Sequence, residues 1–355
     1  MRSLASHGLK VWAADTSRKN ICSMSRFCSG SFVYPDPFTE EQLFIDCLVR
    51  KVRELNPRML LPTHDESVVI IRNRHRFPDT LLIPYESCDL LLTLANKAES
   101  TKIAERAGVP VPKVYHSTDK IDKFPVVFKM VLGNSAKGVF FAANQMELCQ
   151  LMEKHKSTQY LLEEYVGGTD YSVDCVRWDG FWKSSVYHAL VTKTEGGGTT
   201  TQREIVNMPA MEQYAKALLD HVDYHGVCGL DFRYDERTGR IAYIETNARF
   251  TGGLATPIIA GFDIPWVLYK LATEGHYDEP INIQVGTKTK WVLGDIITLV
   301  GRILSLRWSF KEMKQVFSFS GFDGFDDFYK DDKKAILGEM NYYFEKLVKK
   351  RKLNP

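Results

Sequence analysis

One segment near the middle of this 355-residue chain restricts its fold more than any other. The run Val227–Tyr234 is typical of a β-strand, the following DERTGR is typical of a hairpin turn, and a second strand reads Ile-Glu-Thr-Asn. Glu245 and Asn247 are two residues apart, so on a strand they point to the same face. Pairing of the two strands would bring Asp231 beside them. The sequence therefore predicts a hairpin with two carboxylates and an amide oxygen on one sheet face.

The chemistry of these three side chains suits a divalent cation. Carboxylate and amide oxygens are the hard ligands that Mg²⁺ prefers, and Mg²⁺ held in this way also binds substrate phosphates. Asp231, Glu245 and Asn247 are therefore candidate metal ligands. Arg249, two residues past Asn247, is expected on the same strand face as a candidate anion contact. The alternative is an exposed hairpin whose polar residues face solvent.

A candidate phosphate site precedes the hairpin in the chain. Lys129 ends an apolar run, FPVVFK, and a lysine there can reach a phosphate as a point charge. The next loop, Gly133–Gly138, has a glycine at each end, so its backbone N–H groups can approach a phosphate closely. Ser135 and Lys137 add donors to the loop. A plain hairpin connection is the alternative for this turn.

Taken in order, these segments resemble the ATP-grasp superfamily, which includes D-alanine–D-alanine ligase, biotin carboxylase and the large subunit of carbamoyl-phosphate synthetase. The resemblance covers about residues 10–275. It begins where Asn96-Lys97 opens a helix, and it continues through the strand with Lys129, the glycine loop, LLEEYVGGTDYSVDCV and the hairpin. No single segment is decisive, but five in this order are a specific signal.

The resemblance implies roles for further residues. Lys97 resembles the first ATP lysine of the family, although alone it would be an exposed lysine at a helix start. The residues that match the adenine-binding segment are Glu163, Glu164, Tyr165 and Val166. Asp170 falls where related ligases place an acid on the ribose hydroxyls, from which a carboxylate accepts strongly. The alternative for the two glutamates is a solvated pair.

The resemblance implies an α/β architecture in three parts. The first is an N-terminal doubly wound parallel-sheet domain (1–95). The second is a two-lobed α+β ATP-grasp domain (96–282), with a lid at about 126–165 and a metal and substrate lobe at 166–282. The third is a helical C-terminal extension (283–355). In the first part, VWAADT reads as a strand ending in Asp15, Glu40–Asn56 as an amphipathic helix and RMLLPTHDE as a buried strand, an order that favours a parallel sheet. The strand expected before Val11 is missing, so either the sheet lacks it or the true start lies upstream.

Composition narrows the function class. A net charge of +2 is too small to indicate nucleic acid as a general partner. The content of 44% hydrophobic and 25% charged residues is ordinary for a soluble globular protein. The seven cysteines form no CxxC pair, so free thiols in a reducing cytosol are expected. No apolar run reaches the length of a membrane span. We expect a cytoplasmic protein without integral membrane association.

Three segments have open interpretations. Asp295–Leu306 is amphipathic, either as a core helix or as a helix that meets a membrane surface or partner. The basic end KLVKKRK favours a solvated helix end over a lipid or RNA patch. The glycines of HALVTKTEGGGTTTQREIV indicate a loop that could close over substrate or a disordered hairpin tip. Candidate substrate contacts are Lys193, Thr199 and Arg203 in that segment, His64, and the FTGG tract at 250–253.

The function implied is an ATP-dependent carboxylate–amine ligase that forms an acyl phosphate and releases ADP and phosphate. ATP and two Mg²⁺ ions, or Mn²⁺ in their place, are the expected cofactors, with Lys129 and Arg249 as the catalytic cations. Small-molecule carboxylate and amine substrates are expected, with a homodimer as one assembly. The alternatives are a carbamate-activating enzyme like carbamoyl-phosphate synthetase and a non-catalytic ATP-binding subunit.

Overall fold

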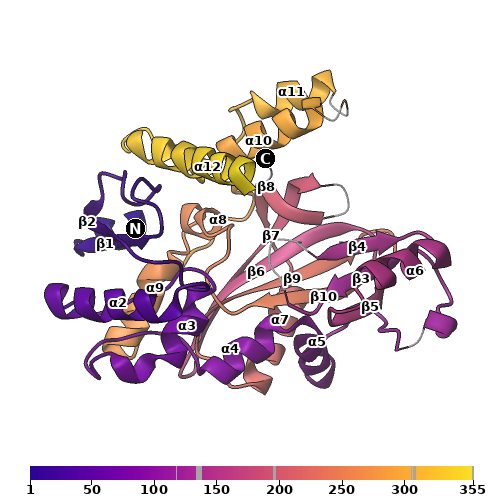
Figure 1. The fold of residues 1–355 in the computed structure, drawn as a ribbon, viewed down its shortest axis with the longest axis horizontal. Coiled ribbons are helices and arrows are strands. Elements are labelled where there is room, and N and C mark those ends of the chain that lie inside the picture. The colour runs from indigo at the N-terminus through magenta and orange to yellow at the C-terminus, as the bar shows by residue number, and fades with distance from the viewer. Residues whose placement is uncertain (117, 133–137, 195–196, 305, 307–308, 354–355) are drawn as a thin grey trace. The chain divides into compact units, whose positions relative to one another are not determined.

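The structure is a computed structural model that describes residues 1–116, 118–132, 138–194, 197–304, 306 and 309–353, with the backbone alone at 119, 193–194, 197–198, 311–312 and 346–353. The chain forms two compact units (Figure 1). One contains Met1–Pro84 and Ala255–Pro355, and we call it the terminal unit. The other, Tyr85–Leu254, is the central unit.

The central unit is built on a sheet of five antiparallel strands in the order β10-β9-β6-β7-β8. Their bounds are β6 (Thr169–Trp178), β7 (Phe181–Thr194), β8 (Gly197–Val206), β9 (Gly226–Asp235) and β10 (Arg240–Asn247). The apolar residues of β6 and β9 alternate with polar ones, so one sheet face is apolar and the other carries polar groups. Helix α7 (Pro209–His221) contacts β6 and β7 and buries Met211, Ala215 and Leu218, which recur at helical spacing.

A smaller sheet of the central unit lies in the region predicted as the lid. It has the antiparallel order β4-β3-β5, with β3 (Val126–Met130), β4 (Val139–Ala142) and β5 (Tyr160–Glu164). Helix α6 (Gln145–Lys154) begins at Asn144, whose side chain accepts a hydrogen bond from the Glu147 backbone N–H at 3.0 Å. Glu147 accepts one in return from the Ala143 N–H, so the helix start is capped from both sides.

Two short helices open the central unit. They are α4 (Cys88–Ala95) and α5 (Lys97–Arg106), and Asn96 caps α5 by accepting from the N–H groups of Ala98 and Glu99 at 3.1 Å each. Asparagine is among the preferred residues at this position. The predicted helix start at Asn96-Lys97 is confirmed, and the cap orients the first turn that carries Lys97.

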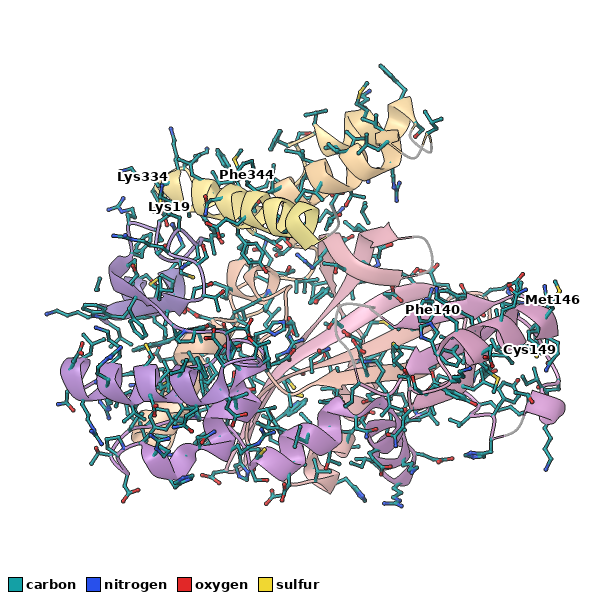
Figure 2. The ribbon with its side chains drawn as sticks, in the orientation of Figure 1. Lys19, Phe140, Met146, Cys149, Lys334 and Phe344 are labelled. Carbon is teal, nitrogen blue, oxygen red and sulfur yellow. The ribbon has the colours of Figure 1, made fainter. Side chains whose placement is uncertain are left out.

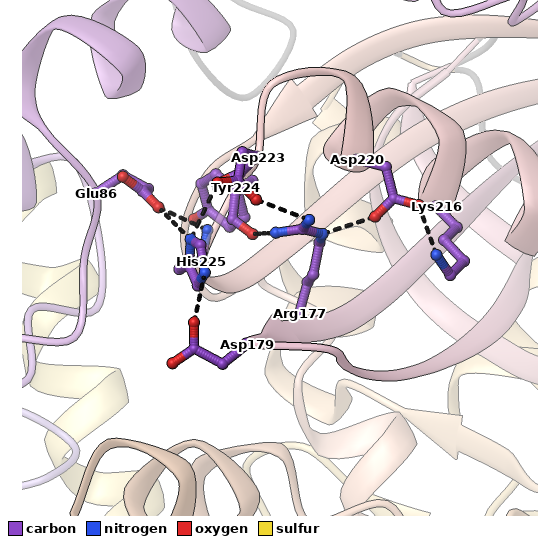
Figure 3. Close-up of polar contacts among 8 residues, drawn as sticks. All are labelled: Glu86, Arg177, Asp179, Lys216, Asp220, Asp223, Tyr224 and His225. Atoms are coloured by element: carbon purple, nitrogen blue, oxygen red, sulfur yellow. Dashed lines mark hydrogen bonds and ion pairs between the residues drawn. The ribbon is translucent and has the colours of Figure 1, made fainter. Parts of the chain in front are cut away.

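A charged network joins distant segments of the central unit (Figure 3). The Arg177 guanidinium at the end of β6 contacts Asp220 at 2.7 Å, Asp223 at 2.9 Å and the Tyr224 carbonyl at 2.6 Å. His225 bonds Glu86 and Asp179 through its two ring nitrogens, at 3.1 and 3.0 Å, and Lys216 pairs with Asp220. These contacts hold the α7–β9 connection against the β6–β7 turn. They involve none of the predicted site residues.

The first part of the terminal unit differs from the sequence prediction. A two-stranded parallel sheet, β1 (Val11–Asp15) with β2 (Cys28–Val33), is present, as are α1 (Arg2–Ser6) and the predicted amphipathic helix, here α2 (Glu41–Leu55). The buried strand predicted for RMLLPTHDE is wrong, because that segment makes only a single parallel bridge between Met59 and Leu82. Pro62 cannot donate to a ladder, and the chain turns after it into α3 (Glu66–Arg72). His64 is exposed at this turn.

The remainder of the terminal unit is largely helical. After η1 (Arg74–Arg76), its elements are α8 (Ala255–Ile259), α9 (Ile264–Glu274), β11 (Lys288–Lys290), α10 (Val292–Leu304), α11 (Phe310–Val316), β12 (Gly324–Phe325) and α12 (Lys334–Leu353). The region predicted as a helical tail thus also contains a short parallel pair, β11 with β12. Among the helices of the described ranges, none is long and apolar enough to cross a membrane.

Candidate active site

The β9–β10 hairpin brings the three candidate metal ligands together. Glu245 pairs directly with Asp231, and Asn247 pairs with Gly229, after a register irregularity between Tyr243 and Glu245. The Asn247 side-chain amide donates to Asp231 Oδ2 at 3.2 Å. The strand pairing expected from the sequence is therefore present, and β9 continues beyond Asp231 to Asp235 before the turn.

The two carboxylates of this hairpin have different partners. Burial, followed by the neighbouring Glu245 carboxylate, raises the pKa of Asp231, whose Oδ1 accepts from Ser172 Oγ at 2.7 Å. Lys97 Nζ lies 3.1 Å from Glu245 Oε2 and is nearly buried, so the helix that Asn96 caps supplies one cation. Two adjacent carboxylates with an amide oxygen are a donor set that fits Mg²⁺. The described part of the chain holds no group of three or more His, Cys, Asp or Glu suited to a metal ion.

In the small sheet, Lys129 and Glu163 form a buried ion pair. Lys129 Nζ lies 2.5 Å from Glu163 Oε2, and the residues are 5% and 1% exposed. They lie diagonally on adjacent strands, because Lys129 pairs with Leu161 and Glu163 with Val127. Glu163 Oε1 is buried and accepts no hydrogen bond from the described residues. Since an unpartnered buried acceptor is costly, a ligand that donates a hydrogen bond fits this position.

The next residue, Glu164, points to the other face of its strand, as alternation requires. It forms an ion pair with Arg240 on β10 and accepts from the Lys113 backbone N–H at 2.8 Å. The hydrogen bond from Arg240 is the main cause that lowers the pKa of Glu164. Glu164 thus links the small sheet to the hairpin. Val166 is buried, and the Tyr165 ring lies 5.7 Å from that of Phe141.

Asp170, the candidate ribose ligand, begins β6 opposite Arg233 of β9. Its Oδ1 lies 3.4 Å from Arg233 Nη1, and burial raises its pKa more than this cation lowers it. Arg233 also donates to the Gly168 carbonyl at 2.6 Å and lies over the Tyr165 ring. Asp170 is therefore tied to the segment that joins the two sheets of the central unit.

The position of Arg249 corrects one prediction. We expected strand geometry to carry it on the same face as Asn247, but β10 ends at Asn247. The Arg249 N–H donates to the Asn247 carbonyl at 2.8 Å, so a tight turn follows the strand at once. Arg249 Nη1 then donates to the Phe250 carbonyl at 3.0 Å. Its place is set by this turn and not by strand alternation.

Sequence reasoning missed three polar residues beside the hairpin. Ser172 and Asp174 follow Asp170 at every second position of β6, and this alternation was a usable signal. Asp174 is 3% exposed, and burial raises its pKa to about 6. Its Oδ1 accepts from Thr251 Oγ1 at 2.9 Å, which holds the FTGG tract, while its Oδ2 is buried without a hydrogen-bond partner. Tyr187 on β7 pairs with Ser172 in the sheet.

Some predicted residues cannot be placed. Ser135 and Lys137 lie outside the described residues, as do the side chain of Lys193 and the residue Gly196. Arg203 lies on β8, is 2% exposed and donates to the Thr200 carbonyl at 2.6 Å.

A family model matches the middle of the chain. Residues 156–294 match the family described as "ATP-grasp in the biosynthetic pathway with Ter operon". This range contains all five strands of the central-unit sheet and thus the whole hairpin. Over this range, which is less than half of the chain, the sequence is similar to that ATP-grasp family.

Individual relatives agree with this assignment. The chain is 24% identical to D-alanine–D-alanine ligase of Fusobacterium nucleatum subsp. nucleatum over 163 residues, which are 43% of this chain and 55% of that protein. It thus spans about half the length of this relative.

Solved structures share the fold. One is an ADP complex of N5-carboxyaminoimidazole ribonucleotide synthetase, with a TM-score of 0.66 and 16% identity, covering 85% of this chain and 81% of that one. Another is the biotin carboxylase domain dimer of Hydrogenobacter thermophilus 2-oxoglutarate carboxylase with MgADP and bicarbonate, with a TM-score of 0.64 and 16% identity, covering 81% and 69%.

Proposed function

We propose that this protein is an ATP- and Mg²⁺-dependent carboxylate–amine ligase. The observation that carries the proposal is the hairpin, where Asp231 and Glu245 lie directly opposite each other with Asn247 bonded to Asp231. Two carboxylates held opposite each other repel, so this arrangement is costly unless a cation compensates their charge. The likeness to D-alanine–D-alanine ligase supports the same reaction class.

The other residues divide between the nucleotide and the reacting groups. Lys97 and Lys129 would neutralise the phosphates of ATP, and Glu163 would accept from the adenine edge through its unpartnered oxygen. Asp170 would accept from the ribose hydroxyls. Mg²⁺ on the hairpin oxygens would supply charge neutralisation at the phosphates. Ser135 and Lys137 remain candidates from the sequence.

The chemical step follows from the substrates. A carboxylate is a poor electrophile, so phosphorylation is needed to give its carbon a leaving group. The carboxylate oxygen attacks the γ-phosphorus of ATP, the bond to ADP breaks, and an amine then displaces phosphate from the acyl phosphate. Arg249 and the N–H groups of the FTGG tract would stabilise charge on the transferring group. No protein nucleophile is required.

One experiment tests this class. The purified protein is incubated with ATP, Mg²⁺ and pools of amino acids, and ADP is measured. With an active acid labelled by ¹⁸O in its carboxylate, one label must appear in inorganic phosphate. Formation of AMP and pyrophosphate, with one label in AMP, would show an adenylating enzyme instead. An acid that keeps both labels would not have been activated by ATP. Carbamoyl phosphate formed when bicarbonate and ammonia are supplied with ATP would support the carbamate-activating alternative. No ADP release from any pool would support a non-catalytic subunit.

A further inference from the structure

Helix α10 (Val292–Leu304) is apolar on two faces. Val292 and Leu299 are buried on one, together with Asp295, which pairs with the fully buried Lys290 at 3.3 Å. On the other, large aliphatic side chains recur at helical spacing and are exposed: Ile296, Val300, Ile303 and Leu304. A surface helix ordinarily carries polar residues on its outer face, and a helix that is apolar all round is ordinarily covered.

The exposed apolar surface continues past the end of α10. Leu304 and Leu306 are 81% and 88% exposed, and Phe310 on the adjacent helix α11 is 73% exposed. Figure 1 shows α10 and α11 packed beside each other, and the two helices are in contact. We call this surface the α10–α11 face, defined by Ile296, Val300, Ile303, Leu304, Leu306, Phe310 and Phe317. Contiguous apolar patches of this kind mark interaction sites.

The charge of the same segment selects the kind of partner. Between residues 296 and 322 the basic residues are Arg302, Arg307, Lys311 and Lys314, and Glu312 is the one acid, so the net charge is 4 − 1 = +3. That exceeds the +2 of the entire chain. Large apolar side chains combined with a basic flank are the composition of helices that lie in the surface of an anionic bilayer.

We propose that the α10–α11 face binds the surface of an anionic lipid bilayer, with Leu304, Leu306 and Phe310 entering the boundary between headgroups and acyl chains. Binding lies on the surface and does not span it, because the 13 residues of α10 reach only about 20 Å against a hydrocarbon core of about 30 Å. This agrees with the lack of a membrane-crossing helix among the described residues.

A second copy of the chain is a poorer occupant of this face. A two-fold interface would place the same surface against itself, and with it two segments that each carry a net charge of +3. A bilayer containing anionic lipid compensates that charge.

Helix α12 also combines exposed apolar side chains with a basic residue. Leu337, Met340 and Phe344 are exposed at helical spacing, and Lys334 opens the helix (Figure 2).

The test is co-flotation of the full-length protein with lipid vesicles. One set contains phosphatidylcholine alone, and the other contains equal amounts of phosphatidylcholine and phosphatidylglycerol. The wild-type protein should float with the anionic vesicles. The double variant Leu304→Ser/Phe310→Ser should lose at least about tenfold in partitioning, since each side chain loses its burial in the bilayer. Both side chains are exposed, so the fold should be retained, and thermal denaturation checks this.

A matched control removes equivalent side chains from elsewhere in the terminal unit. Phe38 and Leu43 are 63% and 56% exposed, and Phe38→Ser/Leu43→Ser should float as the wild type does. Lys314→Glu should weaken flotation with anionic vesicles and make it less salt-sensitive, because less electrostatic attraction remains for salt to screen. Equal flotation of the Leu304/Phe310 variant and the wild type would overturn the proposal. So would a concentration-dependent dimer, seen by light scattering, that this variant alone abolishes, because the face would then be covered by a second copy.

Discussion

Lys129 and Glu163 form a buried ion pair, with Lys129 Nζ 2.5 Å from Glu163 Oε2. The sequence predicts separate contacts for them, Lys129 with the phosphates of ATP and Glu163 with adenine. Pairing is compatible with both roles, because a lysine has three donors and Glu163 Oε1 accepts no hydrogen bond from the part of the chain that the structure describes. It also means that neither residue can be changed without affecting the other.

We expect Lys129→Met to reduce both stability and ATP affinity. Removal of one partner leaves the Glu163 carboxylate buried without its cation, which costs about 3–5 kcal/mol of unfolding free energy. Loss of a charged hydrogen-bond donor should weaken ATP binding by about 1.5–3 kcal/mol. Urea denaturation and calorimetric titration with ATP measure the two effects separately.

The double variant Lys129→Met/Glu163→Gln separates structure from binding. With the buried charge removed, most of the stability should return while ATP affinity stays low. If ATP affinity recovered together with stability, Lys129 would have no contact with the nucleotide.

Glu245→Gln should abolish ADP formation and keep the fold. Mg²⁺ that binds only the folded protein raises its melting temperature, and this rise should be lost in the variant because one of two paired carboxylates is gone. Glu236→Gln, an exposed residue of the turn in the same hairpin, is the matched control and should behave as the wild type. A Glu245→Gln enzyme with wild-type turnover would contradict the metal assignment.

Gly229→Ala should impair activity by displacing the FTGG tract. A Cβ at Gly229 would lie 2.1 Å from Thr251 Cγ2 and 3.3 Å from Asp174 Oδ1, and the first distance is too short for contact. Thr251→Ser removes Cγ2 and keeps the hydroxyl that donates to Asp174. The double variant Gly229→Ala/Thr251→Ser should therefore recover activity. Steady-state kinetics of the two single variants and the double variant test this prediction. If the double variant did not recover activity, the loss in Gly229→Ala would not come from contact with Thr251 Cγ2.

Glu339 should make the terminal unit sensitive to pH. Burial, followed by the charge of Asp327, raises the pKa of Glu339 from 4.5 to about 7, and its Oε1 accepts from Trp291 Nε1 at 2.8 Å. Because the folded state holds this proton more tightly than the unfolded state, its contribution to stability is present below pH 4.5 and is lost as pH rises through about 7. Melting temperatures across this range should fall less steeply for Glu339→Gln. If the melting temperatures of the wild type and Glu339→Gln fell with the same slope, the raised pKa of Glu339 would be contradicted.

Local patterns in the sequence predicted several parts of the fold correctly. Alternation and turn residues indicated the β9–β10 hairpin, which places Asp231 opposite Glu245. The Asn96 cap marked the start of α5, and helical spacing predicted α2. Each of these depends on interactions between residues near one another in the chain. The roles given to the site residues, the domain boundaries, the homodimer and the cytoplasmic location remain predictions.

Long-range pairing decided the rest. The register between β3 and β5 sets the Lys129–Glu163 pair, and Glu164 reaches Arg240 across 76 positions. RMLLPTHDE has the composition of a strand but no ladder partner, so it remains irregular. Periodicity indicated an amphipathic helix over Asp295–Leu306 but could not show which face packs inside, because that depends on the elements beside it. The sequence by itself determined the local elements and the kinds of chemical group they carry, while the tertiary structure decided which groups meet, since burial and cross-strand register depend on residues far apart in the chain.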